Sequence, residues 1–283
     1  MTLVSGDHRL GRIEDMPVDD VGHPASAPLV ARTDHGAPSV FRPENMLREA
    51  RRQKGLVLGV VAPVCILDPD GDVVRHVRRT KGARRSRHWA CYHTEMWEWD
   101  EDGDRFGIVG CAVGASFAVL VAEQLFVSGC EFLVSVASAG QIADLGPPPY
   151  HIVVERALRD EGTSYHYLPA SRFVEADGAL LALADEALAN ASSRVHRGAT
   201  WTTDAPFRET AETIATRRRD GILAVEMEAA ALYAFGRARN KAVLCIAHVT
   251  NQLGCIEGDF EKGDDDGAHD SLAVIRALAG FCR

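Results

Sequence analysis

Hydrophobic positions along the chain fall into short apolar runs that alternate with stretches of helical spacing. Apolar runs of strand length occur at 56–67, 107–113, 132–136, 151–154 and 242–250. Helical spacing occurs at 41–55, at 116–128 and at about 178–192, 208–219, 228–239 and 267–281. Buried parallel strands are apolar on both faces, and helices connect them. The alternation therefore predicts an α/β fold, with one mixed but mainly parallel central sheet flanked by helices.

Two segments depart from this alternation. Residues 1–40 are rich in Pro, Gly, Asp and His without a sustained period, which predicts an irregular N-terminal arm. The segment 89–99 predicts an added antiparallel strand, with Gly103 in the turn that follows it. Because no low-complexity linker or repeat interrupts 41–283, we expect this part to form one domain.

The loops that follow the apolar strands are the expected ligand site, because open α/β sheets bind ligands beyond the carboxyl ends of their strands. The most unusual loop lies in 224–235 (AVEMEAAALYAF), where Glu226 and Glu228 flank Met227. A carboxylate can accept hydrogen bonds from both vicinal hydroxyls of a ribose, and a thioether can support the apolar face of the sugar. A fixed carboxylate also stabilises the positive charge that the sugar gains when its glycosidic bond breaks. The alternative is an amphipathic helix with solvated glutamates, although a spacing of two places both on one face of a strand.

Composition and charge narrow the range of partners. A formal net charge of −9 over 283 residues disfavours nucleic acid as a partner, although the basic stretch 75–87 still allows a small anion. The seven cysteines form no CxxC pair and fit free thiols in a reducing compartment. The first residues lack a signal-peptide pattern, and no apolar run approaches the ~20 residues that span a bilayer. We therefore expect a cytoplasmic protein with no membrane partner.

The segment VEMEAAALYAF at 225–235 resembles the signature of a family that contains the uridine phosphorylases, the hexameric purine nucleoside phosphorylases and the methylthioadenosine nucleosidases. Four further segments resemble this family in the same order, and the resemblance covers most of 56–283. They are GCAVGAS at 110–116, SVASAGQI at 135–142, RDEGTSYHYLP at 159–169 and TTDAPFR at 202–208. The third of them favours the uridine phosphorylase-like branch.

The resemblance implies a role for each matching position. Met227 and Glu228 would hold the ribose, with Glu226 beside them at the junction of sugar and phosphate. Phe207 would stack on the base, although a core aromatic is the alternative for this position. Arg208 is the one arginine close to that aromatic residue, and we include it among the catalytic candidates with Glu228 and Asn251. The floor of the site would be formed by Ser138, Ala139 and Gly140.

Asn251 departs from part of the family. The hexameric purine enzymes and the nucleosidases usually have Asp at this position, and Asp can protonate the departing purine. Asn cannot act as a general acid, but its amide can form a hydrogen bond with the base. The trimeric purine nucleoside phosphorylases have a similar Thr-Asn pair, which leaves a 6-oxopurine substrate open. The alternative is a loop Asn that forms an ordinary turn.

The phosphate half of the site departs further. Phosphorolytic members usually have Arg where this chain has Ser135, and their early phosphate loop is altered here in 67–75. We expect Arg75 and Ser138 to bind phosphate, and Arg87, in the same basic stretch as Arg84 and Arg85, to reach the site of a neighbouring subunit. The early glutamate that is characteristic of the hydrolytic branch has no evident match.

The expected function is phosphorolysis of a uridine-type or purine-type nucleoside to a base and a pentose 1-phosphate by a homo-oligomer, a dimer or a hexamer. Phosphate is the co-substrate, and no cofactor is expected. A metal site at Cys91, His93 and Glu95 is disfavoured because the sequence has no second ligand cluster. Two alternatives are a nucleosidase that uses water and a non-catalytic nucleoside-binding member of the family.

Overall fold

The computed structural model of the chain describes residues 29, 31, 34–189, 194–254 and 257–280. Its helices are α1 (Pro43–Lys54), α2 (Asp72–Thr80), α3 (Ala115–Val127), α4 (Gly178–Leu188), α5 (Ala211–Arg219), α6 (Ala229–Arg239) and α7 (Ala268–Ala279). Its strands are β1 (Val64–Asp68), β2 (Arg84–Arg85), β3 (Met96–Glu101), β4 (Asp104–Gly110), β5 (Phe132–Gln141), β6 (Tyr150–Asp160), β7 (Phe173–Glu175), β8 (Val195–Thr203), β9 (Ile222–Glu226) and β10 (Ala242–Asn251). Short 3-10 helices lie at Thr163–His166, Pro206–Arg208 and Asp264–Gly267.

The strands form one sheet in the order β10-β6-β8-β9-β5-β1-β4-β3-β2, with β7 beside β6. Strand β10 also pairs with β5, so that β5, β10, β6, β8 and β9 form a closed ring. Strands β1, β4, β3 and β2 continue from β5 as an open part of the sheet. The pairs β1–β4, β1–β5, β5–β10, β6–β8 and β8–β9 are parallel. This confirms the α/β fold with a mixed central sheet, but the expectation of an open sheet is wrong for the ring.

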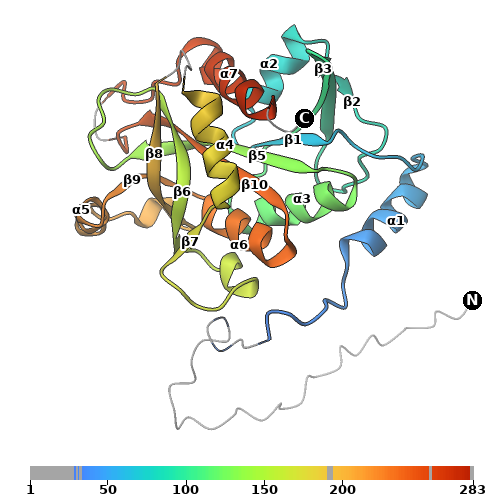
Figure 1. Cartoon of the computed structure of the whole chain (residues 1–283), viewed down its shortest axis with the longest axis horizontal. Helices are drawn as coiled ribbons and strands as arrows, with labels where there is room; N and C mark the ends of the chain where they lie inside the picture. The colour runs from blue at the N-terminus through green and yellow to red at the C-terminus, as the bar shows by residue number, and fades with distance from the viewer. Residues whose placement is uncertain (1–28, 30, 32–33, 190–193, 255–256, 281–283) are drawn as a thin grey trace, which may run out of the picture.

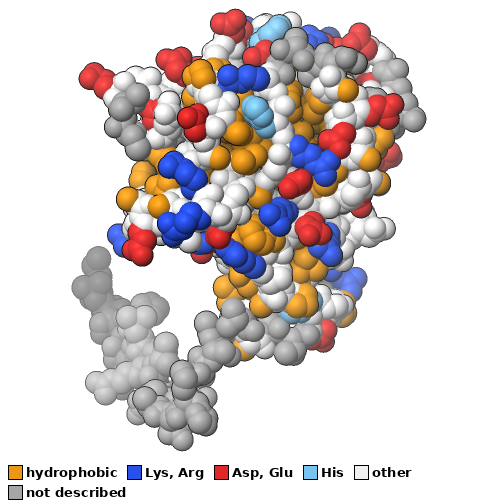
Figure 2. Space-filling view, turned by 60° about the vertical axis from the view of Figure 1, so that its left-hand side comes forward, with side chains coloured by type: hydrophobic (Ala, Val, Ile, Leu, Met, Phe, Trp, Pro, Cys, Tyr) orange, Lys and Arg blue, Asp and Glu red, His pale blue; other side chains and the backbone are white. Residues whose placement is uncertain are grey.

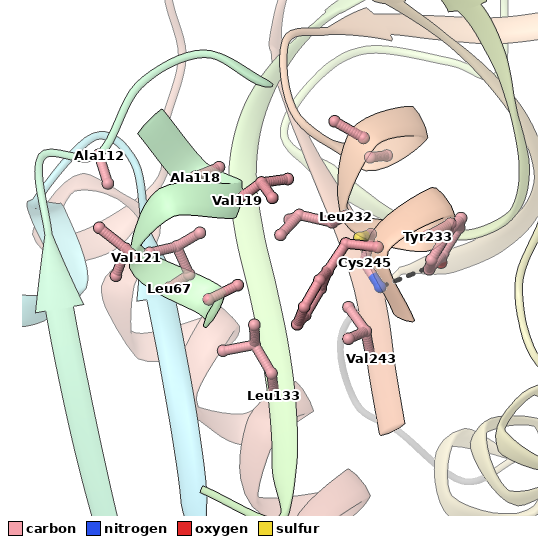
Figure 3. Packing of buried hydrophobic residues seen from close by; sticks show 14 of the residues in the cluster. Leu67, Ala112, Ala118, Val119, Val121, Leu133, Leu232, Tyr233, Val243 and Cys245 are labelled. Carbon is pink, nitrogen blue, oxygen red and sulfur yellow. Dashed lines mark hydrogen bonds between the residues drawn. The ribbon is translucent and has the colours of Figure 1, made fainter. Parts of the chain in front are cut away.

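Helices cover both faces of the strands, as Figure 1 shows, with α4 and α7 on one side and α3 and α6 on the other. On the second side, Val119 of α3 and Leu232 of α6 pack over Leu67, Leu133 and Val243 (Figure 3). The neighbouring strand residues point to the opposite face, because side chains alternate along a strand. There they pack with residues of α2, α4 and α7 around Ile66, Val134 and Ile246.

The helices begin and end near the predicted positions. Helix α1 ends at Gly55, whose φ of 63° is the left-handed conformation that glycine adopts most readily. Helices α4 and α7 match predictions that also include residues outside the described ranges, and the same holds for most of the predicted arm at 1–40. Five cysteines (Cys65, Cys91, Cys111, Cys130 and Cys245) are free thiols, while Cys255 and Cys282 lie outside the described residues.

Two predicted strands begin much later than expected, and one helix was not predicted. The strand predicted at 56–67 begins only at Val64, because 56–63 is an irregular segment that leads from α1 into the sheet. The strand predicted at 89–99 begins at Met96, so 91–95 forms a loop rather than an alternating strand face. Strand β3 does pair antiparallel with β4, and Gly103 lies in the turn between them. Helix α2 was not predicted, because its polar and apolar residues follow an Asp-Pro-Asp-Gly stretch that is typical of a loop.

One face of the molecule shows how charged side chains are distributed (Figure 2). Over the face shown in Figure 2, Lys and Arg side chains are interspersed with Asp and Glu side chains among the described residues. Within the described ranges, no helix combines the length and apolar character needed to cross a membrane. The same ranges contain no group of three His, Cys, Asp or Glu side chains arranged to hold a metal ion.

Candidate active site

The carboxyl ends of β1, β4, β9 and β10 bring four loops together beside the end of β5. The carboxylate of Glu228, after β9, accepts a hydrogen bond from the amide of Gly114 at 2.6 Å, which joins the β9–α6 turn to the β4–α3 loop. The carboxylate of Asp70, after β1, accepts a hydrogen bond from the amide of Ser138 on β5 at 2.8 Å. Asn251 ends β10, where it is the register partner of Gly140 on β5. The loops after β4, β9 and β10 therefore lie together with the loop after β1.

Glu226 is a buried anchor whose carboxylate accepts four hydrogen bonds. One oxygen accepts from the hydroxyls of Thr200 at 3.1 Å and Thr202 at 2.5 Å. The other oxygen accepts from the amides of Glu228 and Ala229, both at 2.7 Å. These amides belong to the first turn of α6, which has no intrahelical partner for them. Glu226 therefore fixes the entry into α6, and its own oxygens are already occupied.

Glu228 is buried beside this anchor. Besides the bond from Gly114, its carboxylate accepts one from the amide of Met227 at 3.2 Å. Burial raises the pKa of Glu228 to about 8, and the negative charges of Glu226 and Asp70 act in the same direction. Met227 is half-buried between the two glutamates. The arrangement gives one preorganised carboxylate next to one thioether, which are the two groups expected to hold a ribose.

The floor of the site is the carboxyl end of β5. Ala139 is buried, Ser138 is half-buried, and Gly140 lies in close contact with the β10 loop. A Cβ atom on Gly140 would lie 2.3 Å from Leu253 Cδ2 and 3.3 Å from Asn251 Oδ1. A larger residue at this position would displace the Leu253 side chain, so glycine lets the β10 loop pack closely on β5.

Asn251 forms hydrogen bonds within its own loop. Its Oδ1 accepts from the amide of Leu253 at 2.9 Å, and its Nδ2 donates to Thr250 Oγ1 at 3.1 Å. Nδ2 also lies 3.5 Å from the carbonyl oxygen of Ala139. The side chain therefore stabilises the turn after β10, which is the alternative that the sequence left open, while its placement at the site floor keeps it close to Gly140.

The loop after β1 is held by Asp68, and helix α2, which follows the loop, carries Arg75. Asp68 accepts hydrogen bonds from the amides of Gly71 at 3.1 Å and Val74 at 2.8 Å. Burial raises the pKa of Asp68 to about 7. The guanidinium of Arg75 contacts the carboxylate of the buried Asp72.

Lys262, in the segment after β10, contacts the other oxygen of the same carboxylate. Its Nζ lies 2.5 Å from Asp72 Oδ2. Arg75 and Lys262 thus share one buried anion, and the segment that precedes α7 becomes part of the site.

Other predicted residues lie apart from these contacts. Phe207 and Arg208 form the exposed 3-10 helix after β8, and the Phe207 side chain is 98% exposed. Arg87 is exposed beyond β2, at the same end of the sheet as Ser138 but with β1, β4 and β3 between β2 and β5. Ser135 is buried inside β5, where it is the register partner of Leu67 and Cys245.

Sequence reasoning missed three residues at the site. Gly114 was part of a recognised glycine-rich loop, but its bond to Glu228 joins segments that are far apart in the chain. Asp70 belongs to an Asp-Pro-Asp-Gly stretch that was treated as an altered phosphate loop. Lys262 had no local signal, since it lies in an irregular segment. A cavity of about 920 Å³ between residues 38–46 and α3 is lined by none of these site residues.

Comparisons with known proteins agree on one family. The family model of the phosphorylase superfamily matches residues 63–280. A purine nucleoside phosphorylase DeoD-type from Colwellia psychrerythraea is 27% identical over 153 residues, which cover 53% of this chain and 65% of that protein. A purine nucleoside phosphorylase DeoD-type from Roseobacter denitrificans is 28% identical over 158 residues, with the same coverage. The chain thus matches slightly less than two thirds of the length of these curated relatives.

Solved structures extend the likeness to the fold. A crystal structure of uridine phosphorylase from Vibrio fischeri, complexed with 6-hydroxy-1-naphthoic acid, is similar with a TM-score of 0.66 and 26% identity. The likeness covers 78% of this chain and 92% of that one. A second structure of uridine phosphorylase from Vibrio fischeri gives a TM-score of 0.65 at the same identity and coverage.

Proposed function

The chain belongs to the phosphorylase superfamily, and from this premise we propose that it cleaves the N-glycosidic bond of a nucleoside by phosphorolysis. The products are a free base and a pentose 1-phosphate. The observation that carries the proposal is the turn between β9 and α6, where Glu226 fixes the backbone that presents Met227 and Glu228. Relatives named for purine nucleosides and neighbours named for uridine support a nucleoside substrate and do not favour one base.

The sugar is held by Glu228 and Met227. The ionised carboxylate of Glu228 accepts hydrogen bonds from the ribose hydroxyls, and the thioether of Met227 packs on the apolar face of the ring. As the bond between C1′ and the base nitrogen breaks, its electron pair leaves with the base and the sugar gains positive charge. The buried carboxylate stabilises this charge more strongly than a solvated one would, because little water screens it.

Phosphate approaches C1′ from the loops after β1 and β5. The amide and hydroxyl of Ser138 donate hydrogen bonds to its oxygens, and the guanidinium of Arg75 supplies a positive charge. One phosphate oxygen forms the new bond to C1′. Arg87 of a neighbouring subunit is proposed to add a second guanidinium, which requires a homo-oligomer, a dimer or a hexamer. The reaction needs no cofactor besides phosphate as co-substrate, and the free thiols fit the reducing cytoplasm.

The base is placed against the other side of the site. The amide of Asn251 forms a hydrogen bond with the base edge as negative charge develops there, and the backbone at Ala139 and Gly140 lines the base plane. Phe207 stacks on the base and Arg208 contacts its edge, which requires the exposed 3-10 helix to close over the bound nucleoside. In this arrangement the departing base is stabilised by a hydrogen bond from Asn251 and is not protonated by it, because Asn has no acidic proton.

Hydrolysis is the second candidate function. Ser135 occupies the position where phosphorolytic members usually have Arg, and its side chain is buried within β5. This position therefore supplies no positive charge to a phosphate dianion, and water could attack C1′ in its place. The remaining possibility is a nucleoside-binding protein without activity.

One experiment separates the three functions. Base release from a panel of purine and pyrimidine nucleosides is measured with and without phosphate. Phosphorolysis requires release that depends on phosphate and yields a pentose 1-phosphate, whereas equal release without phosphate establishes hydrolysis. Binding by calorimetry without release of any base establishes the non-catalytic function. Glu228→Ala should abolish binding of nucleosides, while the matched change Glu212→Ala on the exposed surface of α5 should leave it unaltered.

A further inference from the structure

The carboxylate of Asp70 accepts the hydrogen bond from the Ser138 amide. This amide is the group that we propose donates to the phosphate co-substrate. We propose that Asp70 is a specificity-determining residue that competes with phosphate for this amide and thereby sets the affinity of the site for anions. The inference deepens the proposed function, on which it rests for the identity of the anion. It concerns which co-substrate the site admits, a property that the family signature at 225–235 does not determine.

The geometry supports direct competition. Asp70 Oδ2 accepts the hydrogen bond from the Ser138 amide at 2.8 Å, a normal length for such a bond to a carboxylate. A phosphate oxygen bound to Ser138 would have to accept from the same N–H group. Two anionic oxygens cannot both take one amide proton at this distance, so phosphate enters only after the Asp70 side chain has moved away.

The nearby cations do not hold Asp70 in place. In the described part of the chain the Asp70 carboxylate forms no salt bridge, whereas the neighbouring Asp72 contacts both Arg75 and Lys262. Arg75 reaches Asp70 only at its main-chain carbonyl oxygen, 3.5 Å from Nη1. Both cations therefore pair directly with Asp72, while Asp70 acts on Lys262 and on the centre of the site through its charge alone.

The effect of that charge extends to the groups around it. After the larger contributions of burial and of Glu226, Asp70 also raises the pKa of Glu228. Burial lowers the pKa of His248 to about 4, and Asp70 opposes this shift. Asp70 is thus close enough to the ribose carboxylate for its charge to be felt there. A phosphate dianion placed beside Asp70 would be repelled by its negative charge.

The repulsion depends on the charge of the incoming molecule. A dianion is disfavoured more strongly than a monoanion, and a neutral water molecule is not repelled at all. Asp70 therefore biases the site towards weakly charged nucleophiles, and removal of its charge should shift the preference towards the dianion. Among residues of the site, Asp70 alone combines a half-buried position with a direct bond to the proposed phosphate-binding amide.

Two substitutions separate the charge from the occupancy of the amide. Asp70→Asn keeps an oxygen that can accept from Ser138 but removes the negative charge, and Asp70→Ala removes both. Dissociation constants for inorganic phosphate, and for sulfate as a permanent dianion, are measured by calorimetry on the full chain at fixed pH and ionic strength. Glu212→Gln on α5 removes one negative charge from an exposed position and serves as the matched control.

We expect Asp70→Ala to bind phosphate at least about tenfold more tightly than the natural chain, which corresponds to roughly 1.4 kcal/mol. Asp70→Asn should give a smaller gain, and Glu212→Gln should give none. Unchanged or weaker phosphate binding in Asp70→Asn overturns the proposal, as does a failure of all variants to bind either anion. The isosteric Asp70→Asn keeps the test valid if thermal unfolding shows that Asp70→Ala is not folded.

The test also distinguishes failure of this inference from failure of the proposed phosphorolysis, because binding is measured without turnover. Base release that ignores phosphate, together with tighter phosphate binding in Asp70→Asn, would remove phosphorolysis and keep the role of Asp70. Phosphate-dependent release in the natural chain without any gain in Asp70→Asn would keep phosphorolysis and remove the role of Asp70.

Discussion

Thr202 and Glu226 are joined by a hydrogen bond of 2.5 Å between the hydroxyl of one and the carboxylate of the other. The same hydroxyl accepts a bond from the amide of Ala230 at 2.9 Å. Strand β8 therefore supports the first turn of α6 through one side chain, and the backbone of Met227 and Glu228 is positioned from two sides. The Met-Glu motif depends on a threonine that lies outside it.

The first prediction concerns this anchor. Glu226→Ala leaves two hydroxyls and two amides of the buried turn without their acceptor, and each such loss costs about 1–3 kcal/mol. We expect its free energy of unfolding, measured with urea, to fall by at least about 3 kcal/mol. Glu226→Gln should lose far less, because its oxygen can face the amides while its amide group faces the hydroxyls. Glu186→Ala on the exposed surface of α4 is the control, and equal losses in the two Glu226 variants would contradict the assignment.

The second prediction concerns the pH dependence of nucleoside binding. Burial raises the pKa of Glu228 to about 8, so its carboxyl group is protonated below this pH. The carboxyl group must release this proton before it can bind the ribose hydroxyls as a carboxylate. Nucleoside affinity should therefore rise by up to tenfold per pH unit from about pH 6 to pH 8 and then level off. Calorimetry in buffers of different ionisation enthalpy measures the released proton. Glu228→Gln should bind weakly at every pH, and a steep profile in this variant would assign the proton to another group.

The third prediction concerns a buried histidine pair. The rings of His151 and His248 stack with centroids 4.6 Å apart, and His151 Nε2 lies 3.2 Å from Ser271 Oγ. Burial lowers the pKa of His151 to about 3 and that of His248 to about 4. Both are neutral in the folded protein at pH values where the unfolded chain binds protons. The contribution of the pair to stability is therefore complete above about pH 6.5 and is lost as the pH falls from there towards 4.

This loss can be assigned to the pair by substitution. Each histidine should lower the free energy of unfolding by up to about 1.4 kcal/mol per pH unit as the pH falls through that window, while the raised pKa values of Asp68 and Glu228 act in the opposite direction. His151→Phe keeps a stacked ring and removes one titrating group, so its slope should differ from that of the natural chain by up to about 1.4 kcal/mol per pH unit, towards higher stability in acid, if the fold is retained. His269→Phe, at an exposed position of α7, should keep the original slope. An identical slope in both variants would show that the acid sensitivity has another origin.

The fourth prediction concerns Asn251. Asn251→Asp keeps an oxygen that accepts from the Leu253 amide but loses the donor proposed for the base, and it adds a titratable proton. We expect base release near neutral pH to slow by about one to two orders of magnitude and to acquire an acid-dependent component that the natural chain lacks. Asn251→Ala should also weaken the turn at Leu253. Asn45→Asp, exposed on α1, controls for the added charge, and unchanged rates in Asn251→Asp would leave Asn251 a turn residue only.

The elements of the fold were largely predictable from the chain, because continuous apolar runs and helical spacing are local signals. The run around 132–136 marked β5, and the spacing at 228–239 marked α6. Apolar residues outside the sheet give the same signal as a strand. Leu58 and Val60 extend the apolar run before β1, although both side chains are exposed. Ring closure was not predictable, since it depends on the bend of the sheet that lets β10 meet β5.

Site residues could be predicted where the residues that act together lie in one continuous segment of the chain. Met227 and Glu228 are adjacent in the chain, and the structure places them together beneath Gly114. The partners of Asp70 and Lys262 lie more than sixty residues away, and no local pattern encodes such a contact. Long-range polar contacts therefore cannot be predicted from local sequence patterns, and the structure identifies Asp70 and Lys262 as charged residues of the site.

The closed ring also has a consequence for how the protein is made. Phe132 of β5 pairs with Ala242 of β10, and these residues are far apart in the chain. During synthesis, β5 therefore leaves the ribosome long before β10 has been made. Until β10 is synthesised, the β5 edge that it will cover is a row of unpaired backbone groups among apolar side chains, a surface prone to association with other chains. Chains that end before β10 should therefore aggregate rather than fold in part, because the ring cannot close until β10 has been synthesised.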